Sequence, residues 1–249
     1  MDDNNTQNNG KNRTIFIYGD DIGSVSLVDY MGSDITVVNS ARVSFGVERD
    51  ELDGRDRKLI NYLIRHKHTS TLEHNLITFK FVVPLFVRSQ HHRHRTWSYN
   101  EISRRYTDKD LRFYEPLTFR TQHESNRQAS NEDDVANPVI TPQFIDSYIS
   151  AADAVKSWHN QSLDFFNKLI DAGVCREQAR GVLPQNLYTE YYGTVNLNNL
   201  LKFIDLRTHE GAQWEIQKVA EACLEIATEL FPVTVNAYRK IRNEIQSSS

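Results

Sequence analysis

Apolar and polar residues alternate most regularly in residues 75–83, and this alternation predicts a half-buried β-strand. Its two faces hold, respectively, Ile77, Phe79 and Phe81, and Leu76, Thr78 and Lys80. Aromatic and β-branched residues indicate further strands. These lie at residues 13–20, 23–32 and 186–196, with residues 111–120 as a strand or extended segment. In residues 23–32 we expect Val25, Leu27 and Tyr30 to face inward.

Helical spacing of apolar residues follows between the strands. Residues 56–68 place Leu59, Leu63 and Ile64 on one stripe, which is typical of an amphipathic helix. Asp34 is expected to cap a helix that runs through residue 45. Pro84 is expected to open another helix, because the first turn tolerates a residue without an N–H.

The second half of the chain is predicted to be mainly helical. A long helix is expected from Pro142 to about Ala172, where Gly173 ends it. Shorter helices are expected at residues 175–183 and 196–207. Residues 212–230 form the last predicted helix, with its apolar stripe at Trp214, Val219, Cys223, Ile226 and Leu230.

The chain is predicted to fold as a single domain over residues 13–245. Residues 1–12 are rich in asparagine and predict a disordered tail, and residues 121–141 predict a polar surface loop. Of the 249 residues, 39% are hydrophobic and 25% charged, as in ordinary globular proteins. Two cysteines, Cys175 and Cys223, do not make a disulfide framework, which favours a reducing, cytoplasmic setting. We expect neither a signal peptide nor a membrane span.

Positive charge is concentrated between Arg88 and Tyr106. Five arginines and one glutamate give this segment +4, and because the whole chain carries −4, the remainder carries −8. All five cations are arginine, whose planar fork favours bidentate binding of an oxyanion. Interleaved aromatic residues offer surface to a planar ligand, and polar residues offer donors and acceptors: Trp97, Tyr99, Asn100, Glu101, Ser103 and Tyr106.

Three kinds of site could use this segment. A metal at His92 and His94 is disfavoured, because guanidinium groups surround the histidines and no cysteine or H-E-x-x-H spacing accompanies them. A single-stranded nucleic acid would suit the basic and aromatic residues, but the acidic remainder of the chain argues against it. A small anion such as a nucleotide fits best. Because the chain has no G-x-G-x-x-G or Walker A loop, arginines and helix ends would hold it.

The stretch RHRTWSYNEISRRY, residues 93–106, resembles the R-H-R-x7-S-x-R-Y signature of the flavin-dependent thymidylate synthases. Further similar blocks stand in the family's order, and the resemblance covers roughly residues 24–240 without the loop at 121–141. They are SARVSF, HTSTLEH, REQARGVLPQNLYTEYYGTVN and LRTHEGAQWEI.

The resemblance implies reductive methylation of dUMP to dTMP, with 5,10-methylenetetrahydrofolate as carbon donor. FAD, reduced by NADPH, would deliver the hydride. It also implies an α+β fold with a central antiparallel sheet flanked by helices, assembled as a homotetramer whose sites form where subunits meet. Neither nucleic acid nor a membrane is expected as a partner.

The resemblance also assigns roles to individual residues. The positions that match dUMP contacts are Gln90, Arg93, Glu101, Ile102, Ser103, Arg104, Arg105, Arg180 and Arg207. Arg207 is expected to be catalytic, because positive charge against the pyrimidine favours loss of the N3 proton. The rival is Ser103 as a nucleophile. A serine needs an adjacent base, and the neighbouring side chains are mainly arginines, so we expect Ser103 to bind.

On the cofactor side, the matching positions are Ser70, Arg93, His94, Arg95, Glu101, Asn196, Asn198 and Lys202. His68 is the candidate for stacking on the folate, Glu73 lies in the same block, and Ser44 is a weaker cofactor candidate. Trp214 is interpreted as a core residue, and no metal is expected. The chain departs from some relatives at three positions: Asn198 replaces an arginine, Lys202 an asparagine and Gly211 a histidine.

Two alternatives to an active synthase stay open. One is a flavin-binding protein without synthase activity, against which the intact arginine block and Arg207 argue. The other is a single-stranded nucleic-acid binder. The flavin absorption band of the purified protein would separate this binder from the other two.

Overall fold

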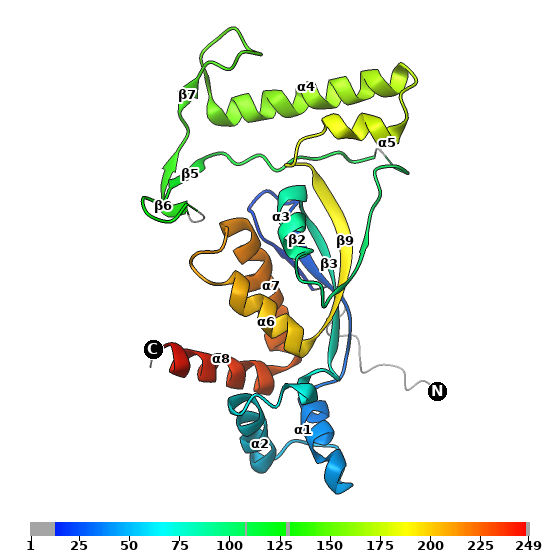
Figure 1. Ribbon diagram of the computed structural model, residues 1–249, viewed down its shortest axis with the longest axis vertical. Coiled ribbons are helices and arrows are strands. Elements are labelled where there is room, and N and C mark those ends of the chain that lie inside the picture. Colours follow the sequence, from blue (N-terminus) through cyan, green and yellow to red (C-terminus); the bar gives the residue numbers. More distant parts are fainter. Residues whose placement is uncertain (1–12, 108, 128–129, 248–249) are drawn as a thin grey trace, which may run out of the picture.

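A five-stranded antiparallel sheet forms the centre of the computed structural model, which describes residues 13–107, 109–127 and 130–247 (Figure 1). The predicted tail, residues 1–12, lies outside the described residues. The strand order is β1-β2-β3-β9-β4. The strands are β1 Thr14–Phe16, β2 Ser24–Met31, β3 Leu76–Pro84, β9 Tyr188–Asn196 and β4 Ser98–Glu101. The predicted α+β class is therefore confirmed.

The alternation in β3 is confirmed. Ile77, Phe79 and Phe81 are fully buried, whereas the residues between them are half-buried. Val25 and Leu27 of β2 are buried, and a bulge between Leu27 and Asp29 then reverses the alternation. This reversal pairs Tyr30 with Ile77 and turns its ring toward Phe231, as predicted, although Tyr30 remains 42% exposed.

Two helices, α6 Leu197–Arg207 and α7 Trp214–Leu230, pack beside the sheet, as Figure 1 shows. Leu200, Phe203, Ile216 and Cys223 from these helices are fully buried in one core together with the inward-facing residues of β2, β3 and β9. Asn196 caps α6, because its side-chain oxygen accepts a hydrogen bond from the Asn199 N–H at 2.9 Å. The strand β9 and the helix α6 are thereby joined without a loop.

One end of the molecule is built from α1 Asp34–Arg42, α2 Gly54–Arg65 and α8 Pro232–Gln246. The expectation that Asp34 caps its own helix is wrong. Ser33 is the N-cap of α1, and the buried Asp34 carboxylate instead accepts from the N–H groups of Val233 and Thr234 at 2.9 and 2.8 Å. Asp34 therefore stabilises the start of α8, a helix that sequence analysis left unassigned. The predicted extension of α1 to residue 45 is a separate 3₁₀ turn, Val43–Phe45.

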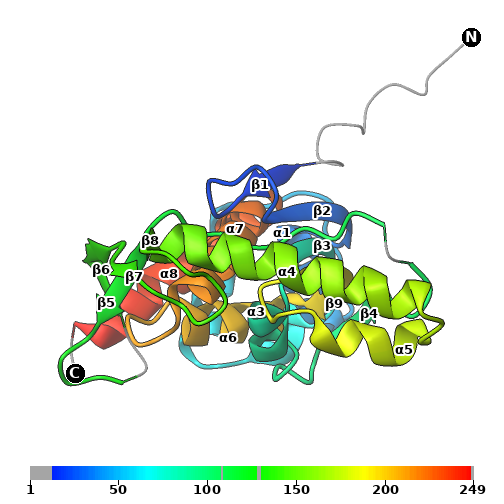
Figure 2. The same cartoon turned by 90° about the horizontal axis from the view of Figure 1, so that it is seen from above.

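The other end carries α4 Ala151–Asp171 and α5 Arg176–Ala179, which lie side by side in Figure 2. A second, smaller core of Phe166, Ala179, Leu183 and Leu187 joins them to the rest of the chain. The predicted start of α4 at Pro142 is wrong, because Ile149–Ser150 pairs as a strand, β8, with β7, Val139–Ile140. Gly173 follows the helix at a φ of 87°, the left-handed conformation expected of it.

The segment predicted as a polar loop, residues 121–141, contains pairing. Its described part includes the end of β5, Phe119–Gln122, the whole of β6, Ser130–Ala136, and β7. Phe113 bridges Leu187, which attaches the extended segment before β5 to the root of β9. Among the helices of the described residues, none is long and apolar enough to cross a membrane.

Candidate active site

The basic segment begins on the short helix α3, Leu85–His91, and ends on the edge strand β4. Pro84 stands at the N-cap of α3, close to its predicted position. His91 is fully buried, and its Nδ1 lies 2.8 Å from the Tyr191 hydroxyl on β9. The Tyr99 hydroxyl donates to the carbonyl oxygens of His91 and His94 at 3.0 and 3.2 Å. These contacts fix the turn that presents Arg93, His94 and Arg95.

Gly193 allows this turn to lie close against the sheet. A Cβ added to Gly193 would stand 2.9 Å from the Phe81 ring and 3.2 Å from the Trp97 ring. The absence of a side chain lets Trp97 pack against β9, where it is 6% exposed. Trp97 directly precedes β4, so its packing sets the position of both the turn and the edge strand.

Arg207 stands at the end of α6 and is held against this turn. Its Nε donates to His94 Nε2 at 3.1 Å, and its Nη2 donates to the Gln90 carbonyl oxygen at 3.3 Å. Burial, followed by the neighbouring Arg207, lowers the pKa of His94 to about 4. The imidazole is therefore neutral at pH 7, and its Nε2 can accept the hydrogen bond from Arg207.

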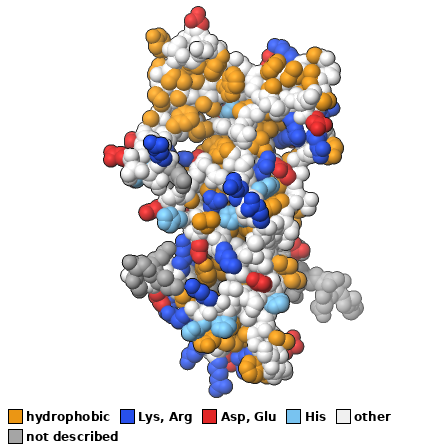
Figure 3. All heavy atoms as spheres, viewed as in Figure 1, with side chains coloured by type: hydrophobic (Ala, Val, Ile, Leu, Met, Phe, Trp, Pro, Cys, Tyr) orange, Lys and Arg blue, Asp and Glu red, His pale blue; other side chains and the backbone are white. Residues whose placement is uncertain are grey.

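The guanidinium of Arg207 shares its surroundings with Arg93. Burial, and then the positive charge of Arg93, lower the pKa of Arg207, although a guanidinium stays protonated at neutral pH. In Figure 3, Lys, Arg and His side chains gather in the middle of the face, where Figure 1 has α3 and α6. Because like charges repel, an anionic ligand would stabilise this arrangement.

The strand β4 continues into a second group of predicted nucleotide residues. Glu101 Oε1 accepts from the Thr189 hydroxyl at 2.6 Å and pairs with Arg88 at 3.3 Å. Ile102 is tied to β9 through its N–H, 2.9 Å from the Glu190 carbonyl oxygen. The predicted role of Glu101 therefore rests on a carboxylate that β9 and α3 hold in place.

The turn after β4 carries three predicted nucleotide residues. Arg105 donates to the Ser103 hydroxyl oxygen from its backbone N–H and from Nε, both at 3.3 Å. Arg104 donates to the carbonyl oxygens of Lys109 and Tyr188 at 2.8 and 3.3 Å. The Ser103 oxygen thus has a cation beside it. A cation attracts an anionic ligand such as a phosphate, but it cannot act as the base that would remove the serine proton.

Arg180 stands on a different element from these residues. It is exposed at the start of a 3₁₀ turn, Arg180–Val182, which follows α5. The preceding residue, Ala179, belongs to the smaller core that holds α4 and α5 together.

A cavity of about 290 Å³ brings together three residues predicted on the cofactor side, namely His68, Asn198 and Lys202. Its walls are partly apolar, with Leu63, Leu72 and Ile241. The α8 residues Tyr238 and Arg242 also line it, and Arg242 pairs with Asp205 at 2.8 Å. Sequence analysis missed these α8 residues. The spacing of Val235, Tyr238 and Ile241 was the available signal, since residues three apart share one helix face.

The remaining cofactor candidates fall around this cavity or elsewhere. Glu73 accepts from Asn198 Nδ2 at 2.8 Å, and the exposed Ser70 belongs to the 3₁₀ turn Thr69–Leu72. Ser44 is exposed in the 3₁₀ turn after α1, and no contact places it with the others among the described residues. The interpretation of Trp214 as a core residue is wrong. It is half-buried, and the Arg120 guanidinium lies 4.8 Å from its ring centre.

Helix α6 connects the two groups of residues. Asn198 and Lys202 stand on its first half and Arg207 on its last turn. With a rise of about 1.5 Å per residue, roughly 14 Å separates Asn198 from Arg207 along the axis. A ligand longer than a mononucleotide could therefore contact both ends of one helix. Among the described residues, no group of three or more His, Cys, Asp or Glu side chains could hold a metal ion.

The lowered pKa of His94 predicts a pH dependence of stability. This histidine becomes protonated near pH 6.5 in the unfolded chain, but only near pH 4 in the folded chain. Between these values the unfolded state binds more protons, so folding stability should fall as the pH drops from about 6.5 toward 4. Urea unfolding at pH 7 and pH 5 would measure the loss. His94→Gln should lose less than the wild type, since an amide oxygen accepts from Arg207 without titrating.

The control for this experiment is His74→Gln, which removes an exposed histidine outside the Arg207 contact. Between pH 7 and pH 5 this variant should lose as much folding stability as the wild type. An equal loss in the wild type and in His94→Gln would contradict the assignment of a neutral His94.

Comparisons of the sequence with known proteins agree on one family. The sequence model described as thymidylate synthase complementing protein matches residues 26–233. A flavin-dependent thymidylate synthase of Thermotoga neapolitana is 41% identical over 220 residues, covering 88% of this chain and 92% of the relative. One from Thermus thermophilus is 42% identical over 222 residues, covering 88% of this chain and 77% of the relative.

A solved structure is similar as well. The UMP/dUMP methylase PolB from Streptomyces cacaoi, bound with 5-Br dUMP, superposes with a TM-score of 0.74 at 33% sequence identity. The match covers 91% of this chain and 97% of that protein. The likeness therefore extends over nearly the whole chain.

Proposed function

Because the chain belongs to the family of flavin-dependent thymidylate synthases, we propose that it methylates dUMP to dTMP. We propose 5,10-methylenetetrahydrofolate as the carbon donor and NADPH as the reductant of a bound FAD. Residues 13–245 are proposed to act as one domain, since helix α6 carries residues of both groups. The relatives are named for flavin dependence, and the similar Streptomyces structure is a methylase bound with a dUMP analogue.

One observation carries the proposal: the guanidinium of Arg207 is fixed by a neutral His94 and a backbone carbonyl beside Arg93. A pyrimidine lying against this guanidinium would lose its N3 proton more readily, because positive charge stabilises the resulting anion. The loss enriches the conjugated ring, and C5 becomes a better nucleophile. We therefore assign the catalytic role to Arg207.

The nucleotide is proposed to lie along the turn before β4 and the turn after it. Gln90, Arg93 and Glu101 face the base and sugar, and the backbone of Ile102 and Arg104 supports them. Ser103 and Arg105 bind the phosphate. The exposed Arg180 is proposed to contribute from another subunit. Ser103 is given a binding role because its oxygen already accepts from Arg105.

FAD supplies hydride transfer when it is bound. The turn of Arg93, His94 and Arg95, together with Glu101, is proposed to hold the flavin, where nearby cations stabilise its electron-rich reduced form. The residues present fit the rest of the cofactor: the cavity of His68, Asn198 and Lys202 combines apolar walls with the cation of Lys202. Ser70, next to the lining residue Thr69, and Asn196, the N-cap of α6, are proposed to contact the cofactor as well. His68 is proposed to stack on the folate.

Assembly into a homotetramer is part of the proposal. Helices α6 and α7 pack on the buried face of the sheet, and the opposite face carries Thr78, Lys80 and Tyr192, of which Tyr192 is 47% exposed. A sheet with one face half-open to solvent supports contact with another copy. Such a contact would also bring the Arg180 of one subunit to the β4 turn of another.

Purification is expected to yield a yellow protein with FAD near one per chain and a mass of four chains by light scattering. Reduced FAD should be reoxidised when dUMP and 5,10-methylenetetrahydrofolate are added together, with dTMP as product. If the protein binds FAD but does not form dTMP, only the cofactor-binding part of the proposal holds. A colourless protein that FAD cannot reconstitute, with salt-sensitive binding of single-stranded nucleic acid, would overturn the proposal.

A further inference from the structure

A buried carboxylate, Glu215, is connected to the proposed catalytic residue through two glutamines. Glu215 stands in the first turn of α7 and is 4% exposed. The N-terminal end of a helix favours negative charge, and a buried carboxylate persists where cations and hydrogen bonds surround it. Its surroundings therefore determine what the residue can do.

One oxygen of Glu215 faces the segment before β6. The Arg120 guanidinium pairs with Oε1 at 2.6 Å, and the Tyr114 hydroxyl donates to the same oxygen at 3.3 Å. Burial, and then Glu215 itself, raise the pKa of Tyr114, so its hydroxyl remains a donor. Arg120 also covers the Trp214 ring. The segment from Tyr114 to Arg120 is thereby fastened to the start of α7.

The other oxygen faces the nucleotide residues. Glu215 Oε2 accepts from Gln213 Nε2 at 2.9 Å, and Gln213 Oε1 in turn accepts from Gln90 Nε2. The carbonyl oxygen of Gln90 is one of the two acceptors that hold Arg207. A continuous series of contacts therefore runs from Glu215 through Gln213 and Gln90 to Arg207.

We propose that Glu215 is a positioning residue for this reaction. Its negative charge orients the Gln213 amide with the nitrogen toward Glu215 and the oxygen toward Gln90. Gln90 then presents its side chain toward the proposed nucleotide site in one orientation, and its carbonyl oxygen holds Arg207. The inference rests on the proposed function, because it assigns Gln90 and Arg207 to dUMP.

The reason for a carboxylate at this position is directional. An amide at residue 215 could offer Gln213 either a donor or an acceptor, so the Gln213 amide could turn around. A carboxylate accepts only, and it therefore leaves one arrangement for Gln213 and Gln90. The positive charge of Arg120 makes that carboxylate tolerable inside the protein.

The test is the variant Glu215→Gln, which keeps the shape and loses the charge. Titration calorimetry with dUMP on the FAD-loaded protein should show binding about tenfold weaker, as expected when one charge-assisted contact is lost. The kcat for dTMP formation should also fall, because Arg207 is less well held. The FAD content should be unchanged.

Asp34→Asn is the matched control. Asp34 is also a buried carboxylate, 6% exposed, but it accepts from the start of α8. Its neutralisation should lower the melting temperature without weakening dUMP binding. If both variants lower stability and leave dUMP affinity unchanged, Glu215 is structural only and the proposal fails.

A second variant keeps the test decisive if Glu215→Gln folds poorly. Gln213→Leu removes the half-buried intermediate residue and should weaken dUMP binding by about the same tenfold. Combining both changes should give about tenfold rather than about a hundredfold weakening, because residues acting in series are not additive. Independent, multiplied effects would overturn the proposal. A wild type that does not bind dUMP would instead refute the proposed function.

Discussion

Arg207→Ala is expected to abolish dUMP methylation while FAD remains bound. Removing a group that stabilises developing negative charge typically lowers kcat by about 10²–10³-fold. Here the loss should be at least that large, because the neighbouring Arg93 is exposed and the turn at His94 and Gln90 loses the side chain it holds. Arg207→Lys should retain little activity, since lysine keeps the charge but not the two-pronged donor that reaches both acceptors. The activity of both variants would be measured under anaerobic conditions, as the rate at which dUMP and methylenetetrahydrofolate reoxidise the reduced flavin.

Ser103→Ala is the opposing experiment. If Ser103 only binds, this variant should weaken dUMP and slow turnover, yet still form dTMP. In the wild type, the Ser103 oxygen accepts from the backbone N–H and the Nε of Arg105, and an arginine cannot serve as the base that a serine nucleophile needs. Complete loss of dTMP formation in Ser103→Ala with dUMP still bound would move the catalytic role from Arg207 to Ser103.

Much of the site could be predicted because its chemistry is local in sequence. The arginines and hydroxyls of residues 88–106 lie in one short segment of helix, strand and turns. Their charge pattern can therefore be recognised from the sequence alone. The contact of Arg207 with His94 could not be predicted from spacing, since 113 residues separate them. The role of Gln213 was hidden for the same reason, because its partner Gln90 lies on another helix.

The fold shows the same division between local and distant causes. The alternation in β3 predicted which residues are buried, because a strand buries every second side chain. Asp34 was expected to cap its own helix, and only tertiary packing places its carboxylate at the start of α8 instead. The start of α4 was placed too early, since the pairing of β7 with β8 competes with helix formation before Ala151.

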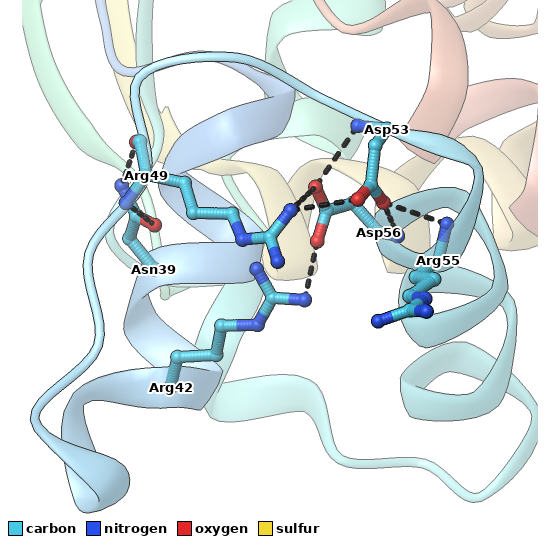
Figure 4. A network of polar contacts seen from close by, with 6 residues as sticks. All are labelled: Asn39, Arg42, Arg49, Asp53, Arg55 and Asp56. Carbon is cyan, nitrogen blue, oxygen red and sulfur yellow. Dashed lines mark hydrogen bonds and ion pairs between the residues drawn. The ribbon is translucent and has the colours of Figure 1, made fainter.

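The corner between α1 and α2 contains another buried carboxylate, Asp56, which is fully buried (Figure 4). Arg42 from α1 pairs with its Oδ1 at 2.5 Å, and Arg49 lies 3.7 Å from its Oδ2. The same oxygen accepts from the Asp53 N–H at 2.9 Å, while the Asp53 carboxylate accepts from the N–H groups of residues 55 and 56. This reciprocal cap starts α2 and fastens it to α1.

Asp56→Leu is therefore expected to lower the free energy of unfolding by about 3–5 kcal/mol, the range typical of breaking a buried ion pair from one side. The loss arises because Arg42, whose side chain is only 17% exposed, keeps a positive charge without its counter-ion. Urea denaturation of the FAD-free protein would measure it. Asp53→Ala, at an exposed carboxylate of the same network, should cost less. Adding Arg42→Met to Asp56→Leu should restore part of the stability, since the stranded charge is removed with its partner. If the double variant is no more stable than Asp56→Leu, the loss comes from the missing cap of α2 rather than from the unpaired arginine.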